Sequence, residues 1–446
     1  MESFNSSHHQ QPQEEEEHRS DLQIYQPSLG FTSPPNAIHM RQLLISCAEL
    51  IAHSDFSAAH RLVSILSANS SPYGDSTVRL AHQFARALFV RLSNCESYIN
   101  ISSAAKSSTY ATSTPCTFAG ASSSSASMMI PAANDANALL SESQLEALRS
   151  CYLTLNQITP FIRFTHLTAN QAILEAIDEG QQAIHILDFD IMHGVQWPPF
   201  MQALAERSYN TLQPPPMLRI TATGNDLALL HKTGERLLRF AQSLGLRFQF
   251  HPLILQLPNN NNDILPSALA LLPEEALAVN CVLYLHRLLK DDFRDLRLFL
   301  HKIKALNPKV VTIAEREADH NNPLFLQTFV DALDHYAAIF ESLEATLPPN
   351  SQERLTVEQI WFGREIMDVV AAEGDNRQRS ERYESWDVML RASGFSNVPL
   401  SPFALSQAKL LLRLHYPSEG YQLHILNDSF FLGWQSRSLF SVSSWH

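Results

Sequence analysis

The second half of the chain alternates between short apolar runs and longer stretches with helical spacing. Short apolar runs bounded by turn residues are typical of buried parallel strands, and a 3.6-residue period is typical of the helices that cover them. This alternation predicts an α/β fold with a mostly parallel sheet flanked by helices. The expected strands are 183–189, Met217–Thr223, Leu246–Pro252, Ala276–Leu283 and Lys309–Ala314, and the expected intervening helices are 200–208, Leu227–Leu244, Asp263–Leu272 and Asp292–Leu306.

A long helical tract follows the last of these strands. Its predicted helices are 322–347, 355–372, 381–392 and 403–414. The chain then ends in a predicted strand hairpin, 421–434 and 438–445, around Gln435-Ser436-Arg437. A parallel sheet closed by a late antiparallel strand pair is the arrangement of the methyltransferase-like variant of the Rossmann-like fold, although a shared fold does not establish a shared function.

The first half of the chain predicts a different organisation. Residues 1–37 are rich in Gln, Glu, Ser, His and Pro, so we expect a disordered N-terminal segment. A single domain should then cover 38–446, with a mainly helical cap over 38–180 and the α/β core over 181–446. Within the cap, the Ser-rich insert 101–138 predicts a flexible loop. The apolar faces of 38–95 fit either a dimerisation surface or ordinary core packing, and core packing is the more common outcome.

Composition limits the possible functions. The chain has 446 residues, 45% of them hydrophobic, and a formal charge of −13, which argues against a broad basic surface for DNA but not against a local one. Its five cysteines lack C-x-x-C spacing, so neither a disulfide framework nor a zinc site is indicated. The polar N-terminus does not have the pattern of a signal peptide, and no apolar run is long enough to predict a membrane span.

The loop after the first predicted strand is where a nucleotide cofactor would bind in such a fold. That loop has one glycine, Gly194, and Ile191 and Met192 crowd the positions where backbone must approach a cofactor. Asp226, after the second strand, fits either a ribose contact or a plain turn. We therefore expect no cofactor.

The residues give little support for metal-dependent or hydrolase chemistry either. Strand alternation separates His185 from Asp188 and Asp190, which share one face, so we expect no metal site. Since no G-x-S-x-G motif is present either, the residues do not predict an enzyme.

Two further patterns each allow a functional and a structural interpretation. Leu285, Leu288 and Leu289 form an L-x-x-L-L match, which can dock a partner but more often belongs to the core. Arg294, Arg297, His301 and Lys304 recur on one helical face. This basic stripe could contact nucleic acid or an acidic partner, although a solvated outer face is the more common explanation.

Several linked motifs resemble those of the plant GRAS family. Ile184-His185-Ile186-Leu187-Asp188 resembles its VHIID motif, and 193–198 fits the extension of that motif. Segment 314–317 resembles the family's acidic-arginine segment, and 38–95 and 227–265 resemble its leucine-rich regions. The PFYRE and SAW regions are matched by Tyr336, Arg364, Glu365, Trp434 and Trp445. The segments 343–350 and 408–417 are similar to the lateral suppressor-like branch in particular.

The resemblance implies a function that the residues alone do not show. It implies a nuclear transcriptional regulator that acts as a scaffold for other transcription factors, zinc-finger proteins included. It also implies homo- or heterodimers with other family members, indirect contact with DNA, and a role in axillary meristem initiation and shoot branching. The alternatives are a direct sequence-specific DNA-binding factor and, less favoured, an S-adenosylmethionine-dependent methyltransferase.

Overall fold

A computed structural model describes residues 37–107, 142–210, 214–254, 269, 271–374 and 377–446. The predicted N-terminal segment and the helix at Asp263–Leu272 lie wholly or mostly outside these residues. Most of the predicted loop 101–138 lies outside them too. Its first seven residues, however, continue helix α3 (Ser76–Ser107) instead of starting a loop.

Within the described residues, the core is one nine-stranded sheet, and its parallel half is the one that the alternating pattern predicts. Its strands follow the order β3-β2-β1-β4-β5-β9-β8-β7, and the short β6 pairs with β9. The first five strands are parallel, and their ends differ from the predicted ones by at most two residues. They are β1 (Ala183–Asp188), β2 (Met217–Gly224), β3 (Phe248–Ile254), β4 (Ala276–Val282) and β5 (Val310–Arg316).

The C-terminal part of the sheet is more elaborate than predicted. The expected strand 421–434 is two strands, β7 (Tyr421–Leu426) and β8 (Ser429–Trp434). The turn between them places Asn427 and Asp428 at φ of 46° and 60°, the left-handed geometry of a two-residue hairpin turn, which Asn and Asp tolerate well. β9 (Arg437–Trp445) then inserts antiparallel between β5 and β8, and β6 (Asn397–Val398) was too short for its pattern to predict.

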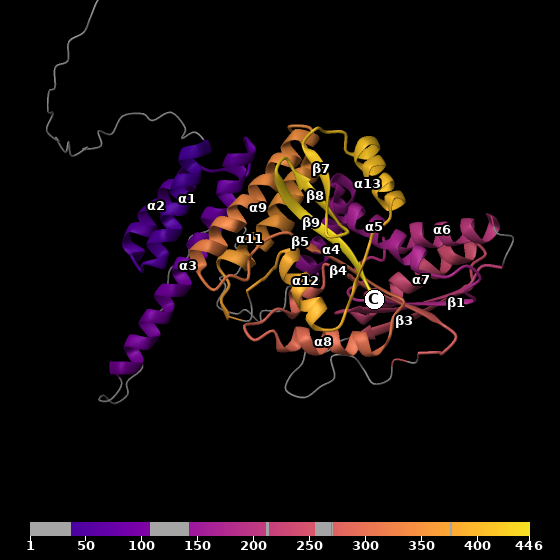
Figure 1. The fold of residues 1–446 in the computed structure, drawn as a ribbon. Helices are drawn as coiled ribbons and strands as arrows, with labels where there is room; N and C mark the ends of the chain where they lie inside the picture. The colour runs from indigo at the N-terminus through magenta and orange to yellow at the C-terminus, as the bar shows by residue number, and fades with distance from the viewer. Residues whose placement is uncertain (1–36, 108–141, 211–213, 255–268, 270, 375–376) are drawn as a thin grey trace, which may run out of the picture. The chain divides into compact units, whose positions relative to one another are not determined.

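Helices cover both faces of the parallel part of the sheet (Figure 1). On one face, α5 (Pro160–Ala176), α6 (Trp197–Asn210) and α7 (Leu227–Ser243) share an apolar cluster with β1 and β2. On the other, α8 (Arg294–Ala305) and α12 (Tyr383–Ala392) share one with β4 and β5. α13 (Pro402–His415) packs against α5. Coverage on both sides explains why the central strands are almost uninterrupted apolar runs.

The first three helices form a helical cap. α1 (Ala37–Ala52), α2 (Phe56–Ala68) and α3 pack against one another, and α1 and α3 also pack against α9 (Phe325–Thr346). α5, which the prediction assigned to the cap as well, instead lies on a face of the sheet. Phe84 of α3 meets Phe329 of α9 edge to face, with ring centroids 5.4 Å apart. Leu44, Leu66 and Leu88 are all buried in the cluster that includes these rings, which confirms core packing for these leucines.

The segment predicted as one helix at 355–372 is interrupted. α10 (Gln352–Thr356) leads into a π-helical turn, η2 (Val357–Phe362), and α11 (Gly363–Val370) follows. Gly363 packs so closely on α3 that a Cβ there would lie 2.7 Å from the Gln83 Oε1 atom. α4 (Glu142–Ile158) lies against η2 on another side. π-turns inside helices are rare and are found often at functional sites.

Candidate functional site

The carboxyl ends of β1, β2, β4 and β5 border a cavity of about 600 Å³. This edge of an open α/β sheet is where ligands usually bind. Its floor consists of polar side chains from the strand ends, and its other walls come from α4, α7, η2, α11 and the loops after β1 and β4. Residues on its wall include Leu148, Tyr152, Met192, Leu229, Leu283, Trp361 and Arg377.

Asp188, the last residue of the VHIID-like motif, anchors the floor of the cavity. Its Oδ1 accepts a hydrogen bond from the Asn280 side chain and its Oδ2 accepts one from the Trp197 indole, both at 2.8 Å. Asn280 in turn bonds to the side chains of Gln196 and Thr312. Burial raises the Asp188 pKa to about 7 although these donors lower it. A buried amide network thus ties β1 to β4, β5 and α6.

The rest of the motif is structural. Ile184 and Ile186 face one apolar cluster, and Leu187 faces the other. The His185 Nε2 lies 2.8 Å from the Thr221 hydroxyl, and its Nδ1 lies 3.1 Å from the Arg219 guanidinium. Burial, followed by the neighbouring guanidinium, lowers the His185 pKa to about 4, so the ring is neutral at physiological pH.

The loop after β1 is tightly constrained. Asp190 and Met192 have φ of 64° and 49°, in the left-handed region that non-glycine residues seldom adopt. The Asp190 carboxylate lies 2.5 Å from the Arg287 guanidinium, away from the network around Asp188. These two carboxylates therefore have different partners, although alternation alone places them on one face. Within the described segments, no group of three or more His, Cys, Asp or Glu side chains is arranged to hold a metal ion.

Asp226, the acid after β2, is already committed to structural contacts. Its Oδ1 accepts the Leu229 amide at 3.1 Å, which caps the N-terminus of α7, and its Oδ2 lies 2.5 Å from the Arg149 guanidinium of α4. Asp226 therefore caps α7 and holds α4. The turn predicted at 223–225 is shorter than expected, since Thr223 and Gly224 still belong to β2.

Two motifs that lie far apart in sequence meet beside the cavity. The Arg316 guanidinium, at the end of β5, forms a buried ion pair with Glu365 of α11, and the Tyr336 hydroxyl donates to the same carboxylate at 3.2 Å. Arg364 instead pairs along its own helix with Asp368 at 3.5 Å, and both side chains are substantially exposed. Arg316 lies within the acidic-arginine segment 314–317 but was not among the predicted site residues. Its position at the end of a buried strand was the available signal.

The remaining predicted site residues divide between core and surface. Leu285, Leu288 and Leu289 are all buried in the cluster with α8, so the L-x-x-L-L match belongs to the core. Trp434 and Trp445 are buried as well. In contrast, Arg294, Arg297 and His301 lie exposed on α8, and the Lys304 ammonium sits 5.2 Å from the Phe395 ring centroid.

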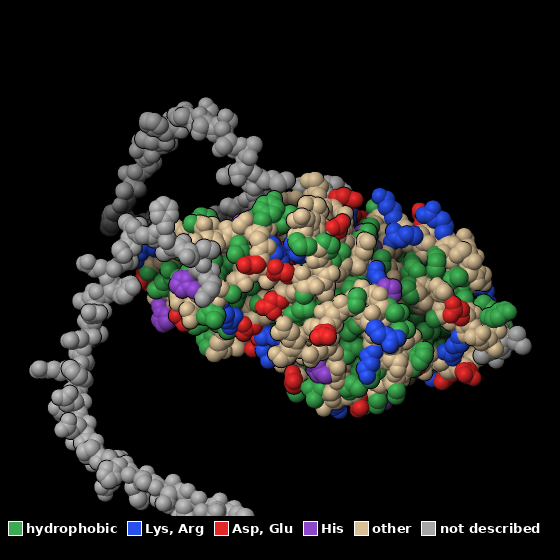
Figure 2. All heavy atoms as spheres, turned by 90° about the horizontal axis from the view of Figure 1, so that it is seen from above, with side chains coloured by type: hydrophobic (Ala, Val, Ile, Leu, Met, Phe, Trp, Pro, Cys, Tyr) green, Lys and Arg blue, Asp and Glu red, His purple; other side chains and the backbone are tan. Residues whose placement is uncertain are grey.

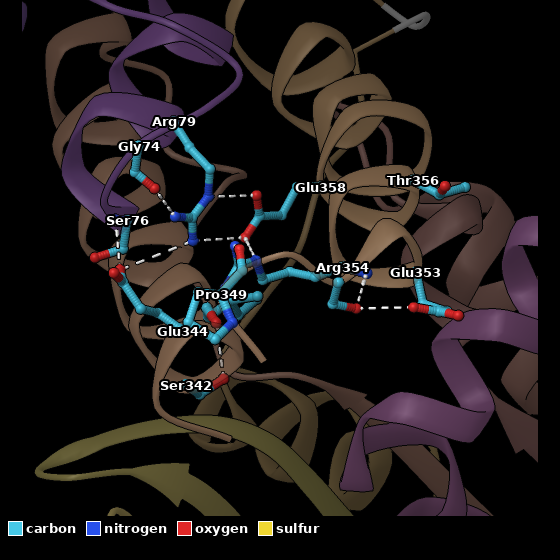
Figure 3. A network of polar contacts seen from close by, with 12 residues as sticks. Gly74, Ser76, Arg79, Ser342, Glu344, Pro349, Glu353, Arg354, Thr356 and Glu358 are labelled. Carbon is cyan, nitrogen blue, oxygen red and sulfur yellow. Dashed lines mark hydrogen bonds and ion pairs between the residues drawn. The ribbon is translucent and has the colours of Figure 1, made fainter. Parts of the chain in front are cut away.

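A second polar network joins the cap to the helix that carries η2 (Figure 3). Arg79 of α3 donates from Nε and Nη2 to the two carboxylate oxygens of Glu358, at 2.7 and 3.0 Å. Both side chains are at most 3% exposed. Such a bidentate pair fixes the geometry of both partners. It therefore sets the position of η2, and with it that of Trp361 in the cavity wall.

These observations define a Rossmann-like domain of methyltransferase type under a helical cap, with polar residues at its strand ends bound mainly to one another. The GRAS domain family model matches residues 40–446. The chain is 52% identical to Scarecrow-like protein 18 of Arabidopsis thaliana over 412 residues, covering 91% of both proteins. It is 44% identical to Protein MONOCULM 1 of Oryza sativa subsp. japonica, covering 91% of this chain and 88% of that one.

A solved structure agrees with these matches. The crystal structure of SCL7 in Oryza sativa superimposes with a TM-score of 0.70 at 33% identity, covering 91% of this chain and 99% of that chain. The chain belongs to the GRAS domain family, a family of plant transcriptional regulators, and its relatives confirm the lateral suppressor-like branch. Among helices of the described segments, none combines the length and hydropathy needed to span a bilayer.

Proposed function

We propose that this chain is a nuclear adaptor that binds other transcription factors, zinc-finger proteins among them, during axillary meristem initiation and shoot branching. The observation that supports an adaptor best is an exposed apolar stripe on α13. Phe403, Leu410 and Leu414 are 59%, 45% and 61% exposed, and their spacing of seven and four residues puts them on one helical face. An apolar helix face of this kind suits a groove or helix on a protein partner.

The charge distribution also favours protein contacts over direct DNA binding. On the face drawn in Figure 2, basic side chains lie in small groups among hydrophobic and acidic ones and do not form one continuous basic surface. On α8, Arg294 pairs with Asp292 at 3.3 Å, which reduces the positive field of the stripe. A DNA-binding face would instead gather unpaired cations along a groove.

The adaptor proposal is tested by binding of a zinc-finger transcription factor to the purified full chain. Replacing Phe403 and Leu414 with Ser should weaken the complex at least about tenfold, because both apolar contacts are lost. Val388→Ser on α12 is the matched control, since Val388 is also apolar and 66% exposed. Equal affinity of the wild-type chain and the double variant would refute a role for the stripe.

Direct DNA binding is the second candidate, carried by the stripe on α8. Alanine at Arg294, Arg297 and Lys304 should leave DNA retention through a bound partner unchanged if the chain is an adaptor. Alanine at the exposed residues Lys232 and Arg239 of α7 controls for general charge loss. Loss of DNA retention by the α8 variant alone, with partner binding intact, would favour direct contact.

A methyltransferase is the least favoured alternative, because the loop after β1 has a single glycine, Gly194, and its Ile191 and Met192 line the cavity where a cofactor would bind. Calorimetry of the folded chain with S-adenosylmethionine tests it. Tight binding at one site would overturn the adaptor proposal in its present form.

A further inference from the structure

We propose that the cavity at the strand ends is a binding site for a small organic acid with a ring-shaped apolar body. This inference is separate from the docking role of α13. The cavity volume of about 600 Å³ lies within the range of pockets that enclose small molecules. The cavity combines a polar floor with apolar and aromatic walls, which is the usual composition of such sites.

The aromatic part of the wall favours a ring. The Tyr152 ring of α4 lies close to two other rings, with centroid distances of 5.9 Å to His193 and 5.7 Å to Trp361. Aliphatic side chains of Leu148, Met192 and Leu283 complete this side of the cavity. Flat ring systems pack on such surfaces through offset or edge contacts.

The backbone around the cavity is also unusual. Met192 has φ of 49° and Leu283 has φ of 53°, and both side chains line the cavity. Trp361 is presented by the π-turn η2. Left-handed non-glycine residues cost stability and cluster at functional sites, and π-turns are frequent at such sites as well. Met192, Leu283 and the π-turn η2 thus place unusual backbone geometry around one cavity.

The charges favour an anionic group on the ligand. Six arginines line the cavity against five carboxylates, and four of these carboxylates (Asp190, Asp226, Glu365 and Asp368) pair with an arginine of the lining. The fifth, Asp188, is bonded to neutral donors and holds a proton more readily than an exposed acid. Within the described part of the chain, the Arg377 guanidinium has no ion-pair partner within 4.0 Å, and the partner of Arg379 is the highly exposed Asp291. The lining therefore carries excess positive charge.

Two lining groups can then recognise the ligand. The Arg377 guanidinium donates from Nη1 to the Asn322 carbonyl at 3.3 Å, and its other N–H groups can bind a carboxylate. Each Asp188 oxygen accepts one hydrogen bond and keeps a second lone pair for a hydroxyl group of the ligand. A ring acid needs neither a glycine-rich loop nor a ribose contact, so these groups favour a different ligand class from the one that the fold would suggest.

The test uses two probes that share one ring system, 2-naphthoate and the uncharged 2-naphthalenemethanol, titrated into the full chain by calorimetry. We expect one saturable site for 2-naphthoate, bound about tenfold more tightly than the alcohol. Arg377→Gln should remove most of this difference, because it deletes the charge that distinguishes the two probes. Equal affinities, or tighter binding of the alcohol, would overturn the assignment of an organic acid.

Location in the cavity is tested by filling it. Leu148→Trp places an indole in the cavity from α4 and should weaken 2-naphthoate binding at least about tenfold. Leu153→Trp is the matched control, because Leu153 lies 41% exposed on the same helix and should change the affinity less than about twofold. If Leu148→Trp fails to fold, Leu229→Trp fills the cavity from α7. Absence of saturable binding, or binding unaffected by a folded cavity-filling variant, would refute the site.

Discussion

The buried pair between Arg79 and Glu358 allows a sharp test of how the cap is attached to the core. Replacing Arg79 with Met keeps the aliphatic stem and removes the charge, which leaves the buried Glu358 carboxylate without these two hydrogen bonds and with Arg354, 3.9 Å away, as its remaining cationic neighbour. Removing one partner of a buried ion pair costs about 3–5 kcal/mol, since the remaining charge stays desolvated. For a domain of this size, with an unfolding entropy of about 2.1 cal/mol/K per residue, this loss lowers the melting temperature by roughly 4–6 °C.

The loss should also depend on pH. Burial raises the Glu358 pKa above its ordinary value although Arg79 lowers it, so removing Arg79 raises this pKa further. A raised carboxyl pKa means that the native state holds the proton more tightly than the unfolded chain. Stability is then greatest below the unfolded pKa and falls as the pH rises through the folded one. The deficit of Arg79→Met relative to wild type should therefore be smaller at about pH 5.5 than at about pH 8.

Scanning calorimetry of four proteins measures this coupling: wild type, Arg79→Met, Glu358→Met, and the double variant. Replacing both partners with apolar groups of similar size removes the unpaired charge, so the double variant should melt above Arg79→Met. The reasoning would be refuted if the melting temperature of Arg79→Met fell by less than about 1 °C. It would also be refuted if the melting temperature of the double variant fell by the sum of the two single-variant decreases.

Three further changes test the packing. Leu288→Ala should lower the free energy of unfolding in urea by about 2–5 kcal/mol, because it opens a cavity in the core. An unchanged unfolding midpoint would mean that the L-x-x-L-L motif is available to a partner. Gly420→Ala should lower the melting temperature, because its Cβ would lie 2.3 Å from the Trp434 ring, and an unchanged value would contradict that close contact. Asp428→Gly should be neutral or stabilising and Asp428→Val destabilising in the same assay, because φ is 60° there; the reverse order would argue against a left-handed turn.

The sequence predicted the parallel core well because its signal is local. Each central strand is an apolar run buried on both faces, so strands such as Ala183–Asp188 stand out from their surroundings. Prediction was weaker where backbone geometry decides the outcome. The turn at Asn427 and Asp428 lies inside an otherwise strand-like stretch, and its residues fit a loop as well as a strand end, so β7 and β8 were merged.

The site was predicted only in part, because its residues meet through tertiary structure. Asp188 is marked by its place at a strand end, but nothing local shows that Trp197 and Asn280 bind it. The pairing of Arg316 with Glu365 joins positions 49 residues apart. The π-turn at Val357–Phe362 has no sequence signature comparable to a helix cap, so a single long helix was the natural prediction.

The position of β9 makes the two halves of the sheet depend on one strand. β9 pairs antiparallel with β5 on one side and with β8 on the other. Without it, β5 would present an open edge, and β8 would lose its hydrogen bonds to the rest of the sheet. A variant that lacks residues 437–446 should therefore expose strand edges that promote aggregation, even though every parallel strand is intact.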